Sequence, residues 1–254
     1  MFLTIVTVCF NSEKTIRRTL ESVLSQDFQD YEYLVVDGAS RDGTLDILRE
    51  YEPKFSGRMR WHSEPDKGIY DAMNKGIRQA RGEYIGLINS DDYYLPNAFT
   101  RVWETVQAAG EKPDVVYSDM DRVNEKGECV KTIPGDPSKM WKGMFVNHPT
   151  CFVSRGAYDR FGLFDTGYRT AADYDLMLRM VKGGGCFAKA PEKLSVLTTG
   201  GASFLNLKGE KEKFRIQRNY YPLPLCCYVY LRSVYACVIR PFFRKLLGKK
   251  DDGV

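Results

Sequence analysis

Apolar and polar positions along the first part of the chain form blocks that fit strands and helices in turn. Residues 2–9 are apolar or β-branched throughout, which is the pattern of a strand buried on both faces of a sheet. Asn11 and Ser12 then offer helix N-caps. The next segment carries its apolar residues on one helical stripe, formed by Ile16, Leu20, Val23 and Leu24. We therefore expect a strand followed by a helix.

This strand-and-helix unit recurs. The segment "YEYLVVDGAS" predicts a strand that ends in a turn, and "RDGTLDILREYE" predicts the helix after it. A third strand is expected over 59–62, then a helix over 69–80 and a strand over 84–88. Strands that alternate with helices in this way predict an α/β fold of Rossmann-like type, with a mostly parallel sheet flanked by helices.

Beyond Pro96 the pattern is less regular. The segment "NAFTRVWETVQAAG" predicts a helix, and a strand near 114–118 and a hairpin around 125–127 follow. We expect three sections. Residues 1–95 and 96–207 form two halves of one domain, and residues 208–254 form a helical, basic and aromatic C-terminal extension.

Composition excludes several classes of protein. Hydrophobic residues make up 43% of the 254 positions and charged residues 28%, which gives no case for disorder or a polytopic membrane protein. The seven cysteines are scattered and lack a metal-binding spacing, so we interpret them as reduced thiols of a cytosolic protein. The N-terminus lacks a basic region ahead of its apolar run, and we expect no signal peptide.

The net charge of +4 is unevenly distributed. Residues 208–250 hold eleven Lys or Arg against two Glu, whereas the rest of the chain has more acidic than basic residues. The longest uncharged run, 219–231, contains two prolines and is too short to span a bilayer. No motif for binding nucleic acid accompanies the charge, so we expect no nucleic-acid partner.

Two structures fit this extension. A helix over 225–239 would be covered mostly by apolar side chains, closed by Arg240 and Pro241, and could lie in an anionic membrane interface. The basic side chains near the headgroups would then be Arg244, Lys245, Lys249 and Lys250. The alternative is an apolar helix packed on the rest of the protein, with a solvated basic end.

Four aspartates fall at or just after the ends of expected strands. Asp37, Asp66, Asp91 and Asp92 should therefore meet in one crevice, because ligands of such sheets bind beyond the carboxyl ends of strands. Adjacent carboxylates repel each other unless a cation lies near them, and Mg²⁺ or Mn²⁺ prefers oxygen ligands. A divalent metal that carries a diphosphate would satisfy Asp91 and Asp92. Helix capping is the competing explanation for this pair.

Five segments in order carry a resemblance to a known family. The segments "TVCFN", "VVDGASRDGT", "DKGIYDAMNKGI", "GEYIGLINSDDYYLP" and "AADYDLMLR" resemble family 2 glycosyltransferases with the GT-A fold. They are most similar to bacterial enzymes that build exopolysaccharide and O-antigen repeat units, over roughly residues 3–200. Each motif is weak or moderate by itself, whereas their order and spacing together are specific.

The resemblance implies a nucleotide-sugar donor and roles for the aspartates. Asp92 would ligate the metal, and Asp91 would hold the ribose or a metal-bound water. Asp37 would contact the base, although a turn-forming role competes, as it does more strongly for Asp42. Val8 and Phe10 match the segment that lines the base pocket, and core packing explains either equally well.

The segment "SEPDKGIYDAMNKG" matches a second nucleotide contact. Asp66 would complete the base or ribose site, and Lys67 would pair with phosphate unless it is simply solvated. The family often has Arg where this chain has Met73, so Asn74 is the candidate substitute for a phosphate contact.

The segment "TAADYDLMLRM" resembles the family's Glu-Asp motif, in which the Asp is the catalytic base. Ala172 stands where the Glu would be, and Asp173 keeps the base position. Capping of the following helix is the competing role for Asp173. Asp175 faces another way and is expected to be structural. His148 falls where related chains contact the acceptor or pyrophosphate, or it is a packed histidine.

These implications define the expected protein. It would be a cytosolic inverting glycosyltransferase, peripheral on the inner face of the cytoplasmic membrane, that acts in cell-surface polysaccharide biosynthesis. It would use Mn²⁺ or Mg²⁺ and a nucleotide-diphosphate sugar, with UDP favoured over GDP. The acceptor would be a glycan carried on a polyprenyl diphosphate. Two alternatives are a nucleotidyltransferase of similar fold, although "CFNSEKT" is not a nucleotidyltransferase signature, and a non-catalytic nucleotide-sugar-binding module.

Overall fold

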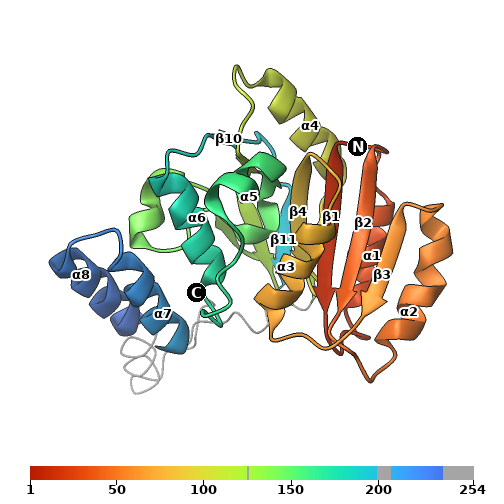
Figure 1. Ribbon diagram of the computed structural model, residues 1–254, viewed down its shortest axis with the longest axis horizontal. Coiled ribbons are helices and arrows are strands. Elements are labelled where there is room, and N and C mark those ends of the chain that lie inside the picture. Colours follow the sequence, from red (N-terminus) through yellow and green to blue (C-terminus); the bar gives the residue numbers. More distant parts are fainter. Residues whose placement is uncertain (125, 199–206, 237–254) are drawn as a thin grey trace.

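The protein folds around a seven-stranded sheet with a smaller four-stranded sheet beside it (Figure 1). The computed structural model describes residues 1–124, 126–198 and 207–236. The large sheet has the strand order β10-β6-β9-β4-β1-β2-β3, and the small one the order β5-β11-β7-β8.

The expected parallel sheet is confirmed. Its four strands are β1 (Leu3–Cys9), β2 (Tyr31–Asp37), β3 (Met59–Ser63) and β4 (Tyr84–Asn89), and all their pairings are parallel. The register places Cys9 opposite Asp37, and Asp37 opposite Ser63. Val8 lies opposite Asn89 on the other side of β1. The carboxyl ends of all four strands therefore lie along one edge of the sheet.

Helices cover both faces of this sheet. Side chains alternate along β1, so that Ile5 packs with the cluster beneath α1 (Ile16–Leu24), and Val6 packs with the cluster beneath α3 (Ile69–Gln79). Helices α2 (Thr44–Tyr51) and α4 (Ala98–Ala108) contribute to the first cluster. Burial on both faces explains why the strand sequences are continuously apolar.

The start of α1 differs from the expectation. The helix begins at Ile16 with Thr15 at the N-cap, and no side chain caps it. Asn11 takes a left-handed φ of +50°, and its Oδ1 accepts from the Arg41 N–H at 2.9 Å. The Ser12 Oγ lies 2.8 Å from the Ser90 Oγ. Both predicted caps are therefore used to tie loops together.

The second half of the chain completes the large sheet. Strands β9 (Phe152–Ser154) and β6 (Val115–Tyr117) add antiparallel pairings next to β4, and β10 (Phe187–Lys189) pairs in parallel with β6. The small sheet joins β5 (Tyr93–Tyr94) and β11 (Ser195–Thr198) to β7 (Met120–Val123) and β8 (Cys129–Ile133), and the last two form the expected hairpin.

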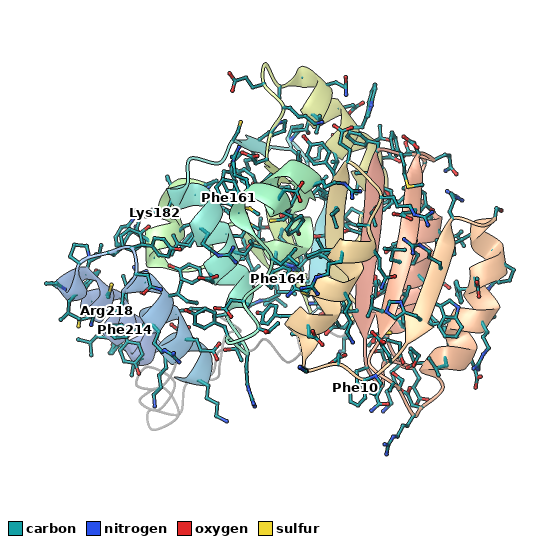
Figure 2. All side chains as sticks on the ribbon, in the orientation of Figure 1. Phe10, Phe161, Phe164, Lys182, Phe214 and Arg218 are labelled. Carbon is teal, nitrogen blue, oxygen red and sulfur yellow. The ribbon has the colours of Figure 1, made fainter. Side chains whose placement is uncertain are left out.

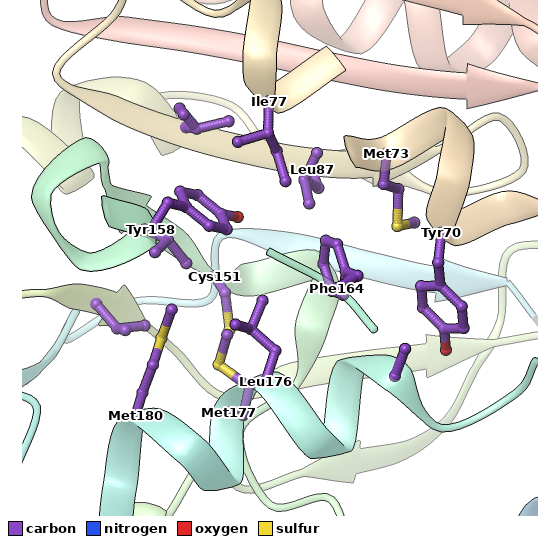
Figure 3. Close-up of a cluster of buried hydrophobic side chains, with 14 of the residues drawn as sticks. Tyr70, Met73, Ile77, Leu87, Cys151, Tyr158, Phe164, Leu176, Met177 and Met180 are labelled. Carbon is purple, nitrogen blue, oxygen red and sulfur yellow. The ribbon is translucent and has the colours of Figure 1, made fainter. Parts of the chain in front are cut away.

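Helices α5 (Arg155–Phe161) and α6 (Ala172–Lys182) enclose the second hydrophobic cluster with α3. Figure 3 shows aromatic and sulfur-containing side chains filling the space between α3 and α6, among them Tyr70 and Phe164. Short 3₁₀ helices occupy Glu52–Phe55, Pro137–Lys142 and His148–Thr150.

Two helices of the C-terminal extension are described, α7 (Leu207–Gln217) and α8 (Leu223–Val234). Ile216 of α7 is fully buried in the cluster that contains α6, and α8 packs on α7 through Phe214 and Tyr230, whose ring centroids lie 5.3 Å apart. Helix α8 begins at Leu223 with Pro222 at the N-cap and Pro224 in its first turn, where the missing N–H of proline costs no helical hydrogen bond.

The end of the expected helix, and Arg240, Pro241, Arg244, Lys245, Lys249 and Lys250, lie outside the described residues. Within the described ranges, none of the helices has both the length and the apolar composition needed to cross a bilayer. The six cysteines of the described part are free thiols, as expected, and Cys237 lies beyond it.

Helix α3 lies close to β1 because Gly76 has no side chain. A Cβ at this position would lie 2.4 Å from Val6 Cγ1 in the centre of the sheet. We expect Gly76→Ala to lower the free energy of unfolding by about 1–3 kcal/mol through overpacking. Gly156 in α5 has open space around its Cβ position, so Gly156→Ala is the matched control and should stabilise by about 0.5–1 kcal/mol. Urea unfolding of both variants checks this, and equal gains would contradict the close packing.

Candidate functional site

A cavity of about 780 Å³ lies at the carboxyl ends of β1 and β4. Most of its described lining comes from the end of β1 and the loop after it, the turn after β4, the N-terminus of α3, and the end of β11. Single positions are added by Asp42, Asp66 and Arg122. The strand arrows of Figure 1 point to this edge of the sheet, and Phe10 lies there in Figure 2. This is where a parallel sheet places its ligands.

Asp92 is the most deeply buried polar side chain among the described lining residues. It is fully buried, and its Oδ1 accepts from the Thr198 backbone N–H at 2.9 Å. Among the described residues, its Oδ2 has no hydrogen-bond partner. Burial, and next the charge of Asp91, raise the pKa of Asp92 to about 8. A buried carboxylate with an unpaired oxygen gains most from a cation.

Arg18 of α1 binds the segment around these aspartates. Its guanidinium donates to the Asp91 carbonyl oxygen at 2.7 Å and to the Thr198 hydroxyl at 2.6 Å, and it stacks over the Tyr93 ring. Thr19 donates to the Asp92 carbonyl oxygen at 2.6 Å. Helix α1 therefore ties the end of β4 to the end of β11.

The residues present fit one divalent metal that shares its ligands with a substrate. Asp92 Oδ2 is an unpaired oxygen donor, and Asp91, whose pKa is raised by burial, adds a second carboxylate in the same cavity. Across residues 1–124, 126–198 and 207–236 no group of three or more His, Cys, Asp or Glu side chains is arranged to hold a metal. Phosphate and water oxygens would have to complete the coordination.

Asp37 lies beneath the cavity and outside its described lining. It is fully buried, and its carboxylate accepts from the Ser40 N–H at 2.9 Å and from the hydroxyls of Ser40 and Ser63 at 2.5 and 2.6 Å. The Cys9 thiol is a further donor at 3.5 Å. These contacts close the turn after β2 and use most of the acceptor capacity of the carboxylate.

Val8, Phe10 and Asp66 do line the cavity. Asp66 also lies against the turn after β2, since a Cβ on Gly38 would lie 2.5 Å from its Oδ2 and 3.4 Å from the Phe10 ring. Phe10 is 61% exposed, which leaves its ring face open to the cavity. Lys67 is exposed and is not part of the described lining.

Asp173 lies at the second residue of α6, outside the described cavity lining but linked to its wall. Its Oδ1 accepts from the Tyr70 hydroxyl at 3.1 Å and from the Tyr174 N–H at 2.8 Å. Tyr70 directly follows Ile69, which lines the cavity. Burial, and next the charge of Asp173, raise the pKa of Tyr70, so its hydroxyl stays a donor. Asp173 is therefore connected to the cavity wall through Tyr70 at the start of α3.

His148 is packed behind this carboxylate. Its ring lies 5.9 Å from the Phe164 ring, and the Phe164 ring lies 5.4 Å from that of Tyr70. Burial lowers the pKa of His148, and the charge of Asp173 opposes this shift. Within the described chain its Nε2 has no hydrogen-bond partner.

Comparison with known proteins decides the family. The model of "Glycosyl transferase family 2" matches residues 4–161, which is more than half of the chain. The chain belongs to glycosyl transferase family 2. A "PGL/p-HBAD biosynthesis glycosyltransferase" of Mycobacterium bovis (strain BCG / Pasteur 1173P2) is 29% identical over 186 residues, which cover 69% of this chain and 68% of that protein. Family membership removes the nucleotidyltransferase alternative.

Solved structures agree on the GT-A fold of this family 2 glycosyltransferase. Residues 1–349 of Staphylococcus aureus TarS in complex with UDP-GlcNAc superpose with a TM-score of 0.72 at 18% identity, over 93% of this chain and 73% of that one. The mannosyltransferase PcManGT from Pyrobaculum calidifontis, in complex with GDP-Man and Mn²⁺, gives a TM-score of 0.68 at 18% identity, over 94% and 71%. At this identity the likeness concerns the fold alone.

Several residues of the glycosyltransferase site have no local signal in the sequence. Arg18 lies next to Arg17 on the polar side of a helix, where the sequence predicts a solvated side chain. The guanidinium of Arg18 instead donates to Thr198 of β11. Thr198 lies 106 residues after Asp92 along the chain, and its N–H reaches Asp92 only because β11 belongs to the second sheet. The aspartates at the ends of expected strands predicted the crevice, whereas these long-range partners require the tertiary structure.

Asn74 of the glycosyltransferase is occupied by a backbone contact. Its Nδ2 donates to the Phe164 carbonyl oxygen at 2.9 Å, and its Oδ1 accepts from the Phe164 N–H at 3.0 Å. It is 3% exposed and lies outside the described cavity lining. The amide therefore holds the loop that carries Phe164 beside Tyr70.

We expect Asn74→Ala to lower the free energy of unfolding by about 2–4 kcal/mol, because it leaves two buried backbone groups unpaired. Asn219→Ala, at an exposed position after α7, should change it by less than about 0.5 kcal/mol. Urea unfolding and UDP titration of both variants check this. Loss of UDP affinity with unchanged stability would instead assign Asn74 to phosphate binding.

Proposed function

We propose that this protein is an inverting glycosyltransferase of cell-surface polysaccharide biosynthesis. It transfers a sugar from a nucleotide-diphosphate donor, UDP-sugar in preference to GDP-sugar, to a hydroxyl of a glycan carried on a polyprenyl diphosphate. The observation that carries the proposal is the unpaired, fully buried Asp92 Oδ2 in a cavity whose volume lies within the usual range for small-molecule sites, about 300–1,000 Å³.

The donor half of the site is assigned to the cavity. Asp92 and Asp91 would hold Mn²⁺ or Mg²⁺, which supplies Lewis-acid stabilisation of the leaving diphosphate when bound. The exposed Phe10 ring offers a stacking surface for the base beside Val8, and Asp66 lies next to it. Asp37 would act on the base through the turn after β2 that it closes, and Lys67 would be a phosphate contact from the edge of the site.

The nucleotides of the structural neighbours support this assignment. TarS is described with UDP-GlcNAc and the Pyrobaculum mannosyltransferase with GDP-Man and Mn²⁺, so the same fold carries nucleotide sugars of both kinds. The mycobacterial relative is named a "PGL/p-HBAD biosynthesis glycosyltransferase", which supports a role in a biosynthetic sequence.

Asp173 is the proposed base. The acceptor hydroxyl gives its proton to the Asp173 carboxylate as its oxygen attacks the anomeric carbon. The bond between that carbon and the diphosphate oxygen breaks on the opposite face, and its electron pair leaves with the diphosphate. One displacement therefore inverts the anomeric configuration. The Tyr70 hydroxyl holds Asp173 Oδ1, which leaves Oδ2 for the acceptor, and His148 packs behind this pair.

Asp173→Asn tests this mechanism. An amide cannot take the proton, so we expect the turnover number to fall by about 10²–10⁴-fold while UDP affinity stays within about twofold. Asp159→Asn, at an exposed carboxylate on α5, is the matched control. The assay incubates each protein with UDP- and GDP-sugars, Mn²⁺ and lipid-linked glycan, and measures release of nucleoside diphosphate and the product anomer.

Three outcomes would contradict the proposal. Loss of UDP affinity in Asp173→Asn would move this residue into the donor site. A product with retained configuration would exclude the single displacement. Binding of nucleotide sugars without transfer to any acceptor would favour the non-catalytic module.

We further propose a peripheral position on the cytoplasmic face of the membrane. Helix α8 buries Cys226 and Val229 against the protein, whereas Leu223, Tyr228, Leu231 and Tyr235 are between 48% and 65% exposed. Tyr228, Leu231 and Tyr235 follow helical spacing and form one outward stripe, beside the exposed Arg232. Packing on the protein and contact with a membrane are therefore compatible, because they use different faces of α8.

Charge on this stripe should release the protein from anionic membranes. Tyr228→Glu with Leu231→Glu is expected to lower partitioning onto phosphatidylglycerol vesicles by about tenfold or more, because two apolar contacts are lost and two negative charges are added. Trp103→Glu, at a 42% exposed position on α4, is the matched control. Vesicle co-sedimentation measures the effect, and equal partitioning of both variants would argue for α8 as a packing helix only.

A further inference from the structure

The N-terminus of α6 is capped by a side chain from another helix. Ala171 occupies the N-cap position, and neither it nor Ala172 carries a side-chain acceptor. Glu212 of α7 supplies the acceptors. Its Oε1 accepts from the Arg169 N–H at 3.0 Å, and its Oε2 accepts from the N–H groups of Thr170 and Ala171 at 2.8 and 3.1 Å. Oε2 also accepts from the Thr170 hydroxyl at 2.8 Å.

This contact is stronger than an ordinary loop hydrogen bond. Partial burial opposes ionisation of Glu212, but the backbone donors outweigh it and lower the pKa of its carboxyl, which therefore remains charged. Charge-assisted bonds to backbone N–H groups at the start of a helix also gain from the helix dipole. Four bonds fix three successive residues, 169–171, directly before α6, whose second residue is Asp173.

Helix α7 is anchored independently of Glu212. Ile216 is fully buried, and Gln217 donates through Nε2 to the Trp141 carbonyl oxygen at 2.9 Å and to the Tyr174 hydroxyl at 3.1 Å. Figure 2 shows α7, with Phe214 and Arg218 labelled, beside α6. Removal of the Glu212 carboxylate would therefore leave α7 in place and release only the segment before α6.

The direction of the Asp173 side chain depends on this segment. Its Oδ1 bonds to the Tyr70 hydroxyl on one side and to the Tyr174 N–H within its own helix on the other. A shift of the first turn of α6 would break one of these bonds and turn the free oxygen away. Such misplacement would lower the reaction rate strongly, because the base must lie at hydrogen-bond distance from the acceptor hydroxyl.

We propose that Glu212 is a positioning residue for Asp173 in sugar transfer. It fixes residues 169–171, so that the carboxylate of Asp173 keeps its direction toward the acceptor hydroxyl. The inference rests on the proposed function. It makes α7 part of the catalytic half of the protein, although the family match ends at residue 161, well before this helix.

The test compares Glu212→Ala and Glu212→Gln with Glu210→Gln in the full-length protein. Glu210 lies on the same helix and pairs with Lys213 at 2.9 Å, so its variant controls for loss of a carboxylate from α7. Turnover and UDP affinity are measured with the lipid-linked acceptor at a temperature where circular dichroism shows every variant folded. Each change is also made in the Asp173→Glu background.

We expect Glu212→Ala to lower the turnover number by about 10–100-fold while UDP affinity stays within about twofold. Glu212→Gln keeps one acceptor oxygen, so its turnover number should fall less. The turnover number of Glu210→Gln should match that of the wild type. In the Asp173→Glu background the base is already displaced. There, Glu212→Ala should lower the turnover number by a clearly smaller factor than it does in the wild type.

Two results would overturn the role of Glu212. One is turnover by folded Glu212→Ala within about twofold of the wild type, which would make the contact only a helix cap. The other is a full, additive loss in the Asp173→Glu background, which would show that Glu212 does not act through Asp173. An absence of transfer by the wild type is a different outcome, because it would overturn the proposed function itself.

Discussion

The site depends on a carboxylate that the fold buries without fully pairing it. Asp92 lies in the turn between β4 and β5 and is closed off from solvent. Its Oδ1 accepts a hydrogen bond from the Thr198 N–H, and its Oδ2 has no hydrogen-bond partner among the described residues. An unpaired buried charge is costly, and its raised pKa reflects that cost. Two separate elements hold it there, since Arg18 and Thr19 of α1 bind the backbone of Asp91 and Asp92 while Thr198 of β11 supplies the N–H. These contacts hold the carboxylate in place and leave one of its oxygens unpaired. Such an oxygen is suited to binding a cation together with an anionic ligand.

Helix α3 joins the cavity to the region around Asp173, which we propose supplies the catalytic base. The N-terminus of this helix lines the cavity, and Tyr70, one residue later, bonds Asp173 at the start of α6. Gly76 lets α3 lie against β1, and Asn74 holds the Phe164 loop against the same helix. Helix α3 therefore fixes the position of the Asp173 carboxylate, which belongs to the second half of the chain, relative to the parallel sheet.

The sequence predicted the parallel sheet and its helices because apolar runs and helical stripes are local patterns. It also predicted the carboxyl-end location of Asp66, Asp91 and Asp92, since strand ends can be read from turn residues. Long-range partners left no such signal. Three contacts join residues that are far apart along the chain, and only the tertiary structure brings them together. They are the Ser63 bond to Asp37, the amide contacts of Asn74, and the Glu212 cap on α6. Strand β9 was missed for the same reason, because three residues carry no periodicity and its place in the sheet comes from its neighbours.

Calorimetric titration of UDP in the presence of Mn²⁺ or of EDTA, with the wild type and with Asp92→Asn, tests the central claim most directly. The account predicts that Mn²⁺ strengthens UDP binding to the wild type by about tenfold or more and that Asp92→Asn loses this gain. Equal UDP affinity of the wild type in Mn²⁺ and EDTA would contradict the claim, and so would a metal-dependent gain that survives in Asp92→Asn.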